Sequence, residues 1–123
     1  MRCVVWRRQR QRDMRILLDH NTPVPLRYAL VGHHVETAFE NQGAELLNGE
    51  LISATEAAGF ELLITTDRGI RYQQNWSARK LALLVLSTND WTRIRRFQTE
   101  VLAAVNSISP AGFLELEIPR RPP

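Results

Sequence analysis

The sequence predicts an α/β domain built around a mostly parallel sheet. A short apolar run ends on an aspartate twice, first at Asp19 and again at Asp67. The segments between the apolar runs carry apolar residues at helical spacing. Strands that are covered on both faces are continuously apolar, so these two observations favour strands that alternate with helices around a parallel sheet.

The first apolar run predicts a buried strand over residues 16–18, with Asp19 at its carboxyl end. Thr22 and Pro23 follow at once and predict the N-cap and the first position of a short helix over residues 23–30. Ligands of open α/β sheets bind outside the carboxyl ends of the strands. Asp19 therefore stands where a functional carboxylate is expected.

A second short strand, nearer an edge of the sheet, is predicted for residues 33–37. Neighbouring side chains of a strand point to opposite faces, so His33 and His34 cannot readily chelate one ion. We expect surface or hydrogen-bonded histidines. Residues 38–49 form a connection that leads to the second helix.

The second helix is predicted from about Glu50 to Ala58, with Asn48 as its cap and Gly59 as a left-handed stop. Four residues form its expected apolar face: Leu51, Ile52, Thr55 and Ala58. The third strand follows over residues 60–67 and repeats the pattern of an apolar run that ends on an aspartate.

Three elements complete the chain after a polar, basic stretch at residues 68–80. Residues 81–86 are the most continuous apolar run and predict a central buried strand. Asp90 caps a last helix over residues 91–107, which is expected to bury Ile94, Phe97, Val101, Ala104, Val105 and Ile108. Residues 113–118 alternate between apolar and acidic side chains, which predicts a half-exposed edge strand.

The length of 123 residues and the hydrophobic content of 44% predict one domain over residues 14–118, between tails at residues 1–13 and 119–123. No apolar run approaches the roughly 20 residues needed to span a bilayer, and residues 1–13 lack the apolar stretch of a secretory signal, so a cytoplasmic protein without a membrane partner is expected. The single cysteine, Cys3, excludes an internal disulfide and has no thiol companions for a structural zinc site.

The net charge of +3 is concentrated at the N-terminus. Residues 1–13 hold five arginines and one aspartate, so the rest of the chain carries −1. Such a tail is expected to be disordered when alone and can bind phosphate backbones without sequence preference. The alternative is that Met14 is the natural start and that the tail has no role.

Three acids have candidate positions at one edge of the sheet. Asp19 and Asp67 end strands, and Glu50 opens a helix whose first turn can lie at the same edge. Carboxylates that converge repel one another unless a cation holds them, and Mg²⁺ or Mn²⁺ prefers such oxygen ligands. The alternative is that Glu50 has a structural role only, since a carboxylate in the first turn of a helix is favoured by the helix dipole.

Four stretches carry a resemblance to a known family: residues 16–23 (ILLDHNTP), 48–51 (NGEL), 59–67 (GFELLITTD) and 71–75 (RYQQN). Together they resemble the small bacterial branch of the PIN-like superfamily, over about residues 14–118. The resemblance implies a three-layer α/β/α sandwich, and many members are Mg²⁺- or Mn²⁺-dependent ribonucleases, often toxins of toxin-antitoxin pairs. It further implies that Asp19, Glu50 and Asp67 match three of the acidic metal-site positions.

The chain departs from the family pattern at Gly69, where many relatives have a further acid. Metal-dependent RNA hydrolysis is the leading expectation, with RNA favoured and DNA as an alternative substrate. The second interpretation is a catalytically inactive nucleic-acid-binding or regulatory protein, with a homodimer as one form it can take. A third is an interaction protein whose acidic edge strand pairs with an antitoxin protein or with a second copy.

The polar stretch after Asp67 supplies the candidate nucleic-acid-binding residues: Arg68, Arg71, Tyr72, Gln74, Arg79 and Lys80. The cations could neutralise phosphates, while Tyr72 could stack on an unpaired base. The alternative is that Tyr72 and Trp76, four residues apart, only cover the sheet while the charges face water. Arg93, Arg95 and Arg96 form a second basic cluster, for which a solvated helix face is the simpler interpretation.

Overall fold

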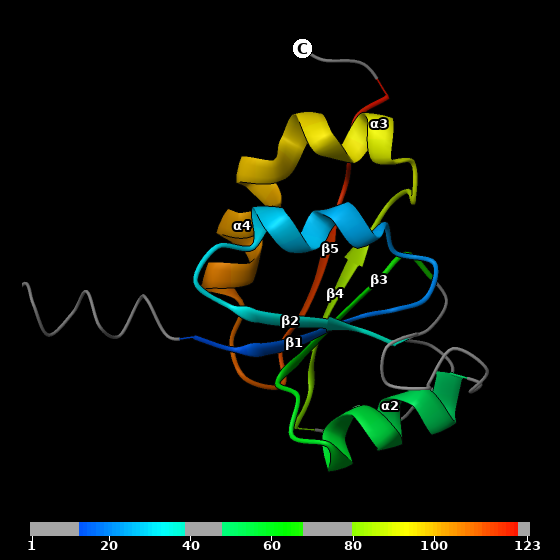
Figure 1. The fold of residues 1–123 in the computed structure, drawn as a ribbon, viewed down its shortest axis with the longest axis vertical. Helices are drawn as coiled ribbons and strands as arrows, with labels where there is room; N and C mark the ends of the chain where they lie inside the picture. The colour runs from blue at the N-terminus through cyan, green and yellow to red at the C-terminus, as the bar shows by residue number, and fades with distance from the viewer. Residues whose placement is uncertain (1–12, 39–47, 68–79, 121–123) are drawn as a thin grey trace, which may run out of the picture.

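The computed structural model describes residues 13–38, 48–67 and 80–120 (Figure 1). Five strands form one sheet: β1 (Arg15–Leu18), β2 (His34–Thr37), β3 (Leu62–Thr65), β4 (Ala82–Leu86) and β5 (Phe113–Leu116). Their order is β2-β1-β3-β4-β5, and every neighbouring pair is parallel. The predicted α/β fold with a parallel sheet is confirmed.

Five helical segments accompany the sheet: η1 (Val24–Ala29), α2 (Asn48–Ala57), α3 (Trp91–Ile94), η4 (Arg95–Phe97) and α4 (Gln98–Ser107). The segments η1 and η4 are 3-10 helices. Figure 1 shows η1, α3 and α4 together on one side of the strands and α2 on the other.

Both faces of the sheet are buried, as the continuous apolar runs require. On one face Ile16, Leu18 and Ile64 pack with α4 and η1 residues in one core cluster. On the other face Leu17 and Leu63 pack with Leu51 and Ile52 of α2. The period-2 alternation of a strand divides each apolar run between the two cores, which explains why no polar side chain interrupts it.

The last helix is interrupted, contrary to the prediction of a single helix over residues 91–107. It divides into α3, η4 and α4, and the break comes at Phe97, whose φ of −125° and ψ of 28° are not helical. The predicted cap is confirmed, because the Asp90 side chain accepts a hydrogen bond from the Thr92 amide at 2.9 Å. The apolar spacing continues across the break, so the pattern alone could not reveal it.

Two details of the earlier helices also differ from prediction. The Thr22 hydroxyl does not cap η1; it donates to the Ile64 carbonyl at 3.1 Å and so ties the η1 entry to β3. Ala58 lies beyond the end of α2 and is exposed, whereas Leu51, Ile52 and Thr55 are buried as expected. Tertiary contacts override the local preference in both cases.

The two neighbouring histidines are hydrogen-bonded, as predicted. His33 accepts from the Met14 amide through Nδ1 and meets Asn106 through Nε2 at 2.7 Å. His34 Nε2 lies 2.5 Å from a Glu36 carboxylate oxygen. The two histidines therefore have different hydrogen-bond partners.

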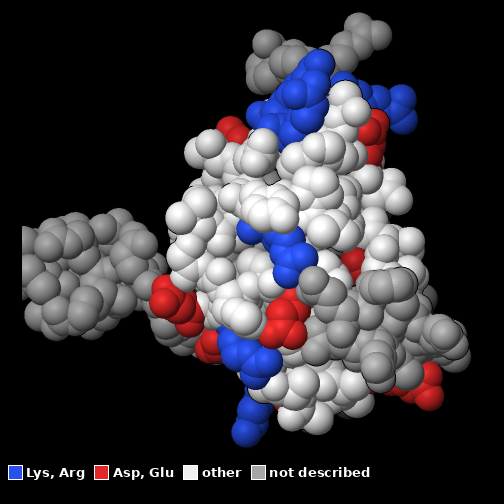
Figure 2. Space-filling view, in the orientation of Figure 1, with Lys and Arg blue, Asp and Glu red and all other residues white. Residues whose placement is uncertain are grey.

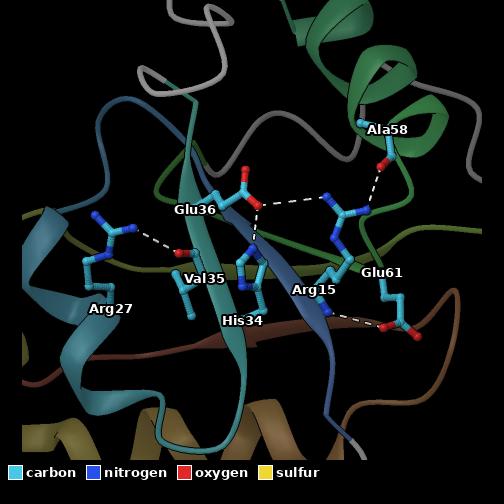
Figure 3. A network of polar contacts seen from close by, with 7 residues as sticks. All are labelled: Arg15, Arg27, His34, Val35, Glu36, Ala58 and Glu61. Carbon is cyan, nitrogen blue, oxygen red and sulfur yellow. Dashed lines mark hydrogen bonds and ion pairs between the residues drawn. The ribbon is translucent and has the colours of Figure 1, made fainter.

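Arg15 joins α2 to the amino edge of the sheet, where the strands begin (Figure 3). Its Nη1 donates to the Ala58 carbonyl at 2.7 Å, and its guanidinium lies 4.5 Å from the centre of the Phe60 ring. Its Nη2 lies 3.8 Å from Glu36 on β2. A cation is favoured at a helix C-terminus, so Arg15 fixes the end of α2 at this edge.

Candidate functional site

The candidate site lies at the carboxyl edge of the sheet, where β1 and β3 end side by side. The strand order reverses between these two strands, because β2 lies on one side of β1 and all later strands lie on the other. In doubly wound sheets this reversal opens the crevice in which ligands bind. Asp19 follows β1 at this point, with only 4% of its surface exposed.

The backbone fixes Asp19 before its side chain makes any contact. Its amide donates to the Ile64 carbonyl at 2.9 Å and extends the β1–β3 ladder by one residue. Its carbonyl accepts from the Thr22 amide at 2.9 Å in the turn that leads to η1. The main chain is therefore fixed by hydrogen bonds both before and after the Cα atom that carries the carboxylate side chain.

Three donors surround the Asp19 carboxylate. The Oδ1 atom accepts from the Asn21 amide at 3.2 Å and lies 3.0 Å from His20 Nδ1. The Oδ2 atom accepts from the Thr65 hydroxyl at 2.5 Å. A buried carboxylate needs such partners, because an unpaired charge in the interior is costly.

Thr65 connects the two aspartates of the repeated pattern. It is the last residue of β3 and fully buried, and its Oγ1 accepts from the Asp67 amide at 3.1 Å while it donates to Asp19. Asp67 itself is half-buried. The hydroxyl thus brings together the two strand ends that the sequence singled out.

The position of Glu50 follows from the direction of α2. The C-terminal end of the helix contacts Arg15 at the amino edge, so its first turn, with Glu50, points toward the carboxyl edge. Glu50 is exposed. Within the described ranges there is no group of three or more His, Cys, Asp and Glu side chains placed to hold a metal, so convergence of Glu50 with Asp19 and Asp67 stays a prediction.

The predicted nucleic-acid-binding stretch falls mostly outside the described residues. Arg68, Arg71, Tyr72, Gln74 and Arg79 all lie there, as does Gly69. Lys80 is described and exposed, and its amide donates to Glu56 at 2.7 Å near the amino edge. Lys80 therefore lies at the opposite end of the strands from Asp19.

A cavity of about 580 Å³ also lies at the amino edge, away from the two aspartates. Its lining includes Met14, Phe60, Glu61, Lys80 and Leu81. These residues precede strands β1, β3 and β4. We place the candidate site at Asp19 and not at this cavity, because the buried carboxylate lies at the carboxyl edge, where β1 and β3 diverge in strand order and where ligands of such sheets bind.

Two members of the site, Thr65 and His20, were not predicted. The Thr65 contact depends on the register that pairs Leu18 with Ile64, which places the residues after them side by side. Hydroxyl residues directly before a strand-end aspartate, as in Thr65-Thr66-Asp67, are a usable signal for such a partner. His20 is signalled only by its place next to Asp19.

Comparison with known proteins found no matching family model, no matching curated protein and no matching solved structure. Among the described residues, no helix is long and apolar enough to cross a membrane.

Proposed function

We propose that the chain is a PIN-like domain, a three-layer α/β/α sandwich that acts on nucleic acid, with metal-dependent RNA hydrolysis as its activity. The observation that carries this proposal is the buried Asp19 carboxylate at the strand-order reversal, linked through Thr65 to the backbone of Asp67. Ligands of open α/β sheets bind outside the carboxyl ends of the strands at such a reversal, and this supports a functional role for the buried carboxylate.

The residues present fit a hard divalent cation in the chemistry of their donors. Asp19 and Asp67 supply carboxylate oxygens, which Mg²⁺ and Mn²⁺ prefer. Each carboxylate oxygen can accept two hydrogen bonds or ligand contacts, and Oδ2 of Asp19 accepts one hydrogen bond, from the Thr65 hydroxyl. Asp19 and Asp67, with Glu50 as the third acid, are the residues that would hold the ion.

The chain's own groups have distinct parts in this proposal. When bound, the metal would activate a water molecule and offset the charge that develops on the phosphate. Thr65 orients the Asp19 carboxylate by donating to Oδ2, and the Asn21 amide orients Oδ1. Without a cation, Asp19 and Asp67 would repel a phosphate, so a bound ion would strengthen phosphate binding near these two charges.

The test compares cleavage of a mixed RNA pool by the wild type, Asp67→Asn and Glu100→Gln. Asp67→Asn removes one negative charge and keeps the shape of the side chain, so we expect Mn²⁺-dependent cleavage to fall by about 100-fold or more while the protein stays folded. Glu100→Gln makes the same charge change on the exposed surface of α4 and is expected to retain activity. Cleavage that survives both a chelator and Asp67→Asn would refute the metal mechanism.

A second candidate, an inactive nucleic-acid-binding protein, is favoured by one specific observation. The Asp19 carboxylate already has hydrogen-bond partners on both oxygens, so the fold does not need a cation to support it. In that case the wild type binds RNA with no cleavage of any substrate. Asp67→Asn then leaves the affinity unchanged or raises it, because a repelling charge has been removed.

A further inference from the structure

A cluster of arginines lies at the carboxyl edge beyond β4 and β5, apart from the two aspartates. Within the described ranges the chain has seven lysines and arginines, and four of them fall in two short stretches: Arg93, Arg95, Arg96 and Arg120. Figure 2 shows Lys and Arg side chains gathered at the end of the molecule where Figure 1 places α3 and the C-terminal residues. We call the three exposed members, Arg95, Arg96 and Arg120, the arginine patch.

Arg93 has a structural part and brings the two stretches together. Its Nη2 donates to the Ile118 carbonyl at 2.7 Å, and its Nε contacts the Pro119 carbonyl at 3.4 Å. The Ile118 amide in turn donates to the Ser87 hydroxyl at 2.7 Å, just after β4. Arg120 is thereby fixed beside α3 and η4, although 24 residues separate it from Arg96.

The patch is not neutralised by the acids that the structure describes. No ion pair joins Arg95, Arg96 or Arg120 to a carboxylate in the described part of the chain. The acids nearest to the patch in sequence are Glu117, three residues before Arg120, and Glu100, four residues after Arg96, and no ion pair of the described residues joins either acid to the patch. The side chain of Asp90 accepts the Thr92 amide as a helix cap. An ordinary solvated surface intersperses the two signs of charge, so three unpaired arginines together indicate an anionic partner.

The acids of β5 face the other side of the sheet. Leu114 and Leu116 pack into the core beneath α3 and α4, so the alternation of the strand sends Glu115 to the opposite face. Glu115 and Glu117 line a small hollow with Val85, Ser87 and Leu116.

We propose that the arginine patch binds the phosphate backbone of a single-stranded nucleic acid that crosses the carboxyl edge toward Asp19. Three strand-to-strand steps of about 4.8 Å separate β5 from β1, so a strand of nucleic acid that starts beyond β5 has to pass the ends of β4 and β3 to reach Asp19. Arginine suits this task, because its planar guanidinium binds phosphate oxygens in pairs. This inference rests on the proposed action on nucleic acid, and it adds where the backbone is held.

The experiment measures the salt dependence of binding to a short labelled oligouridine, in chelator so that no cleavage intervenes. The variant Arg95→Gln/Arg96→Gln/Arg120→Gln keeps Arg93 and its contacts. The control Val31→Glu/Ala54→Glu/Ala103→Glu lowers the net charge by the same three units at exposed positions elsewhere. Circular dichroism confirms that each variant is folded.

We expect the slope of log affinity against log salt concentration to be smaller in magnitude by about 2 in the patch variant, because each of the three lost phosphate contacts contributes roughly 0.7 to the slope. A fourfold rise in salt should then weaken the wild type about 16-fold more than it weakens the patch variant. The control should keep the wild-type slope, because slope counts contacts and not net charge.

The outcomes separate this inference from the proposed hydrolysis. Equal slopes for the patch variant and the wild type would overturn the patch while leaving Mn²⁺-dependent cleavage untouched. A patch-dependent slope without any cleavage would support the patch and refute the hydrolysis. Absence of RNA binding by the wild type, or binding only to phosphatidylserine vesicles, would overturn the patch as a nucleic-acid surface.

Discussion

Replacing Thr65 with valine removes the hydroxyl that links the two aspartates while keeping the volume and the strand propensity of the side chain. The Asp19 carboxylate then loses the donor to Oδ2 and stays buried. A hydrogen bond to a charged group contributes about 1.5 to 3 kcal/mol, and the Asp67 amide loses its acceptor as well. We expect the free energy of unfolding to fall by roughly 2 to 4 kcal/mol.

A matched control is available in Thr55→Val. Thr55 is also buried, at 2% exposure, but its hydroxyl donates only to the neutral Leu51 carbonyl of its own helix. A neutral hydrogen bond of this kind contributes about 1 kcal/mol, so the two identical chemical changes should differ by at least about 1 kcal/mol. The difference combines the charge of the Asp19 acceptor with the second hydrogen bond that Thr65 accepts from the Asp67 amide.

Urea denaturation of both variants measures the effect, with an unchanged m-value as the sign that the transition is still two-state. A double-mutant cycle of Thr65→Val with Asp19→Asn should then give a coupling energy of about 1 kcal/mol or more, because the two residues share one contact. A loss for Thr65→Val no larger than for Thr55→Val would refute the argument that a buried charge depends on this hydroxyl.

Three further predictions concern the elements that position the site. Gly59→Ala and Gly32→Ala both place a side chain at a backbone φ of +90°, and this strain costs roughly 1 to 3 kcal/mol at each position. The two positions differ in space: the new Cβ would lie 2.8 Å from Arg15 Nη1 at Gly59, but would have no atom of a non-neighbouring residue within 4 Å at Gly32. Thermal unfolding should therefore show a larger loss for Gly59→Ala, and equal losses would argue against a close Arg15 contact. Asp90→Ala should lower stability by about 1 kcal/mol through loss of the α3 cap, whereas Asp90→Asn should cost little; equal effects of both would exclude the capping role. Leu84→Ala, at a fully buried position on β4, should lower the free energy of unfolding by about 2 to 5 kcal/mol in urea denaturation, and a smaller loss would contradict the burial of that strand between β3 and β5.

The sheet was predictable because its strands are short and continuously apolar. Residues 16–18 and 81–86 have no alternation, and only burial on both faces explains that pattern, so the presence of helices on both sides followed. The alternation of residues 113–118 likewise predicted an exposed edge strand, which β5 is. In each case the pattern of apolar and polar residues in the strand itself predicts which of its faces are buried.

The parts that escaped prediction depend on contacts between distant residues. Thr22 has the sequence of an N-cap, but the β3 carbonyl that it reaches is 42 residues away. The role of Thr65 likewise requires the β1–β3 register, and the register is not visible in either strand alone. The positions of Asp19 and Asp67 were predictable from local pattern, whereas the hydroxyl that joins them was not.

A crystal grown with Mn²⁺ tests whether Asp19 and Asp67 hold a divalent cation between β1 and β3. Anomalous scattering locates manganese without any assumption about activity. We expect an anomalous peak within coordination distance, roughly 2.0 to 2.4 Å, of carboxylate oxygens from both aspartates. An anomalous map without a peak at this edge, with the Asp19 carboxylate still bonded to Thr65 and His20, would contradict it.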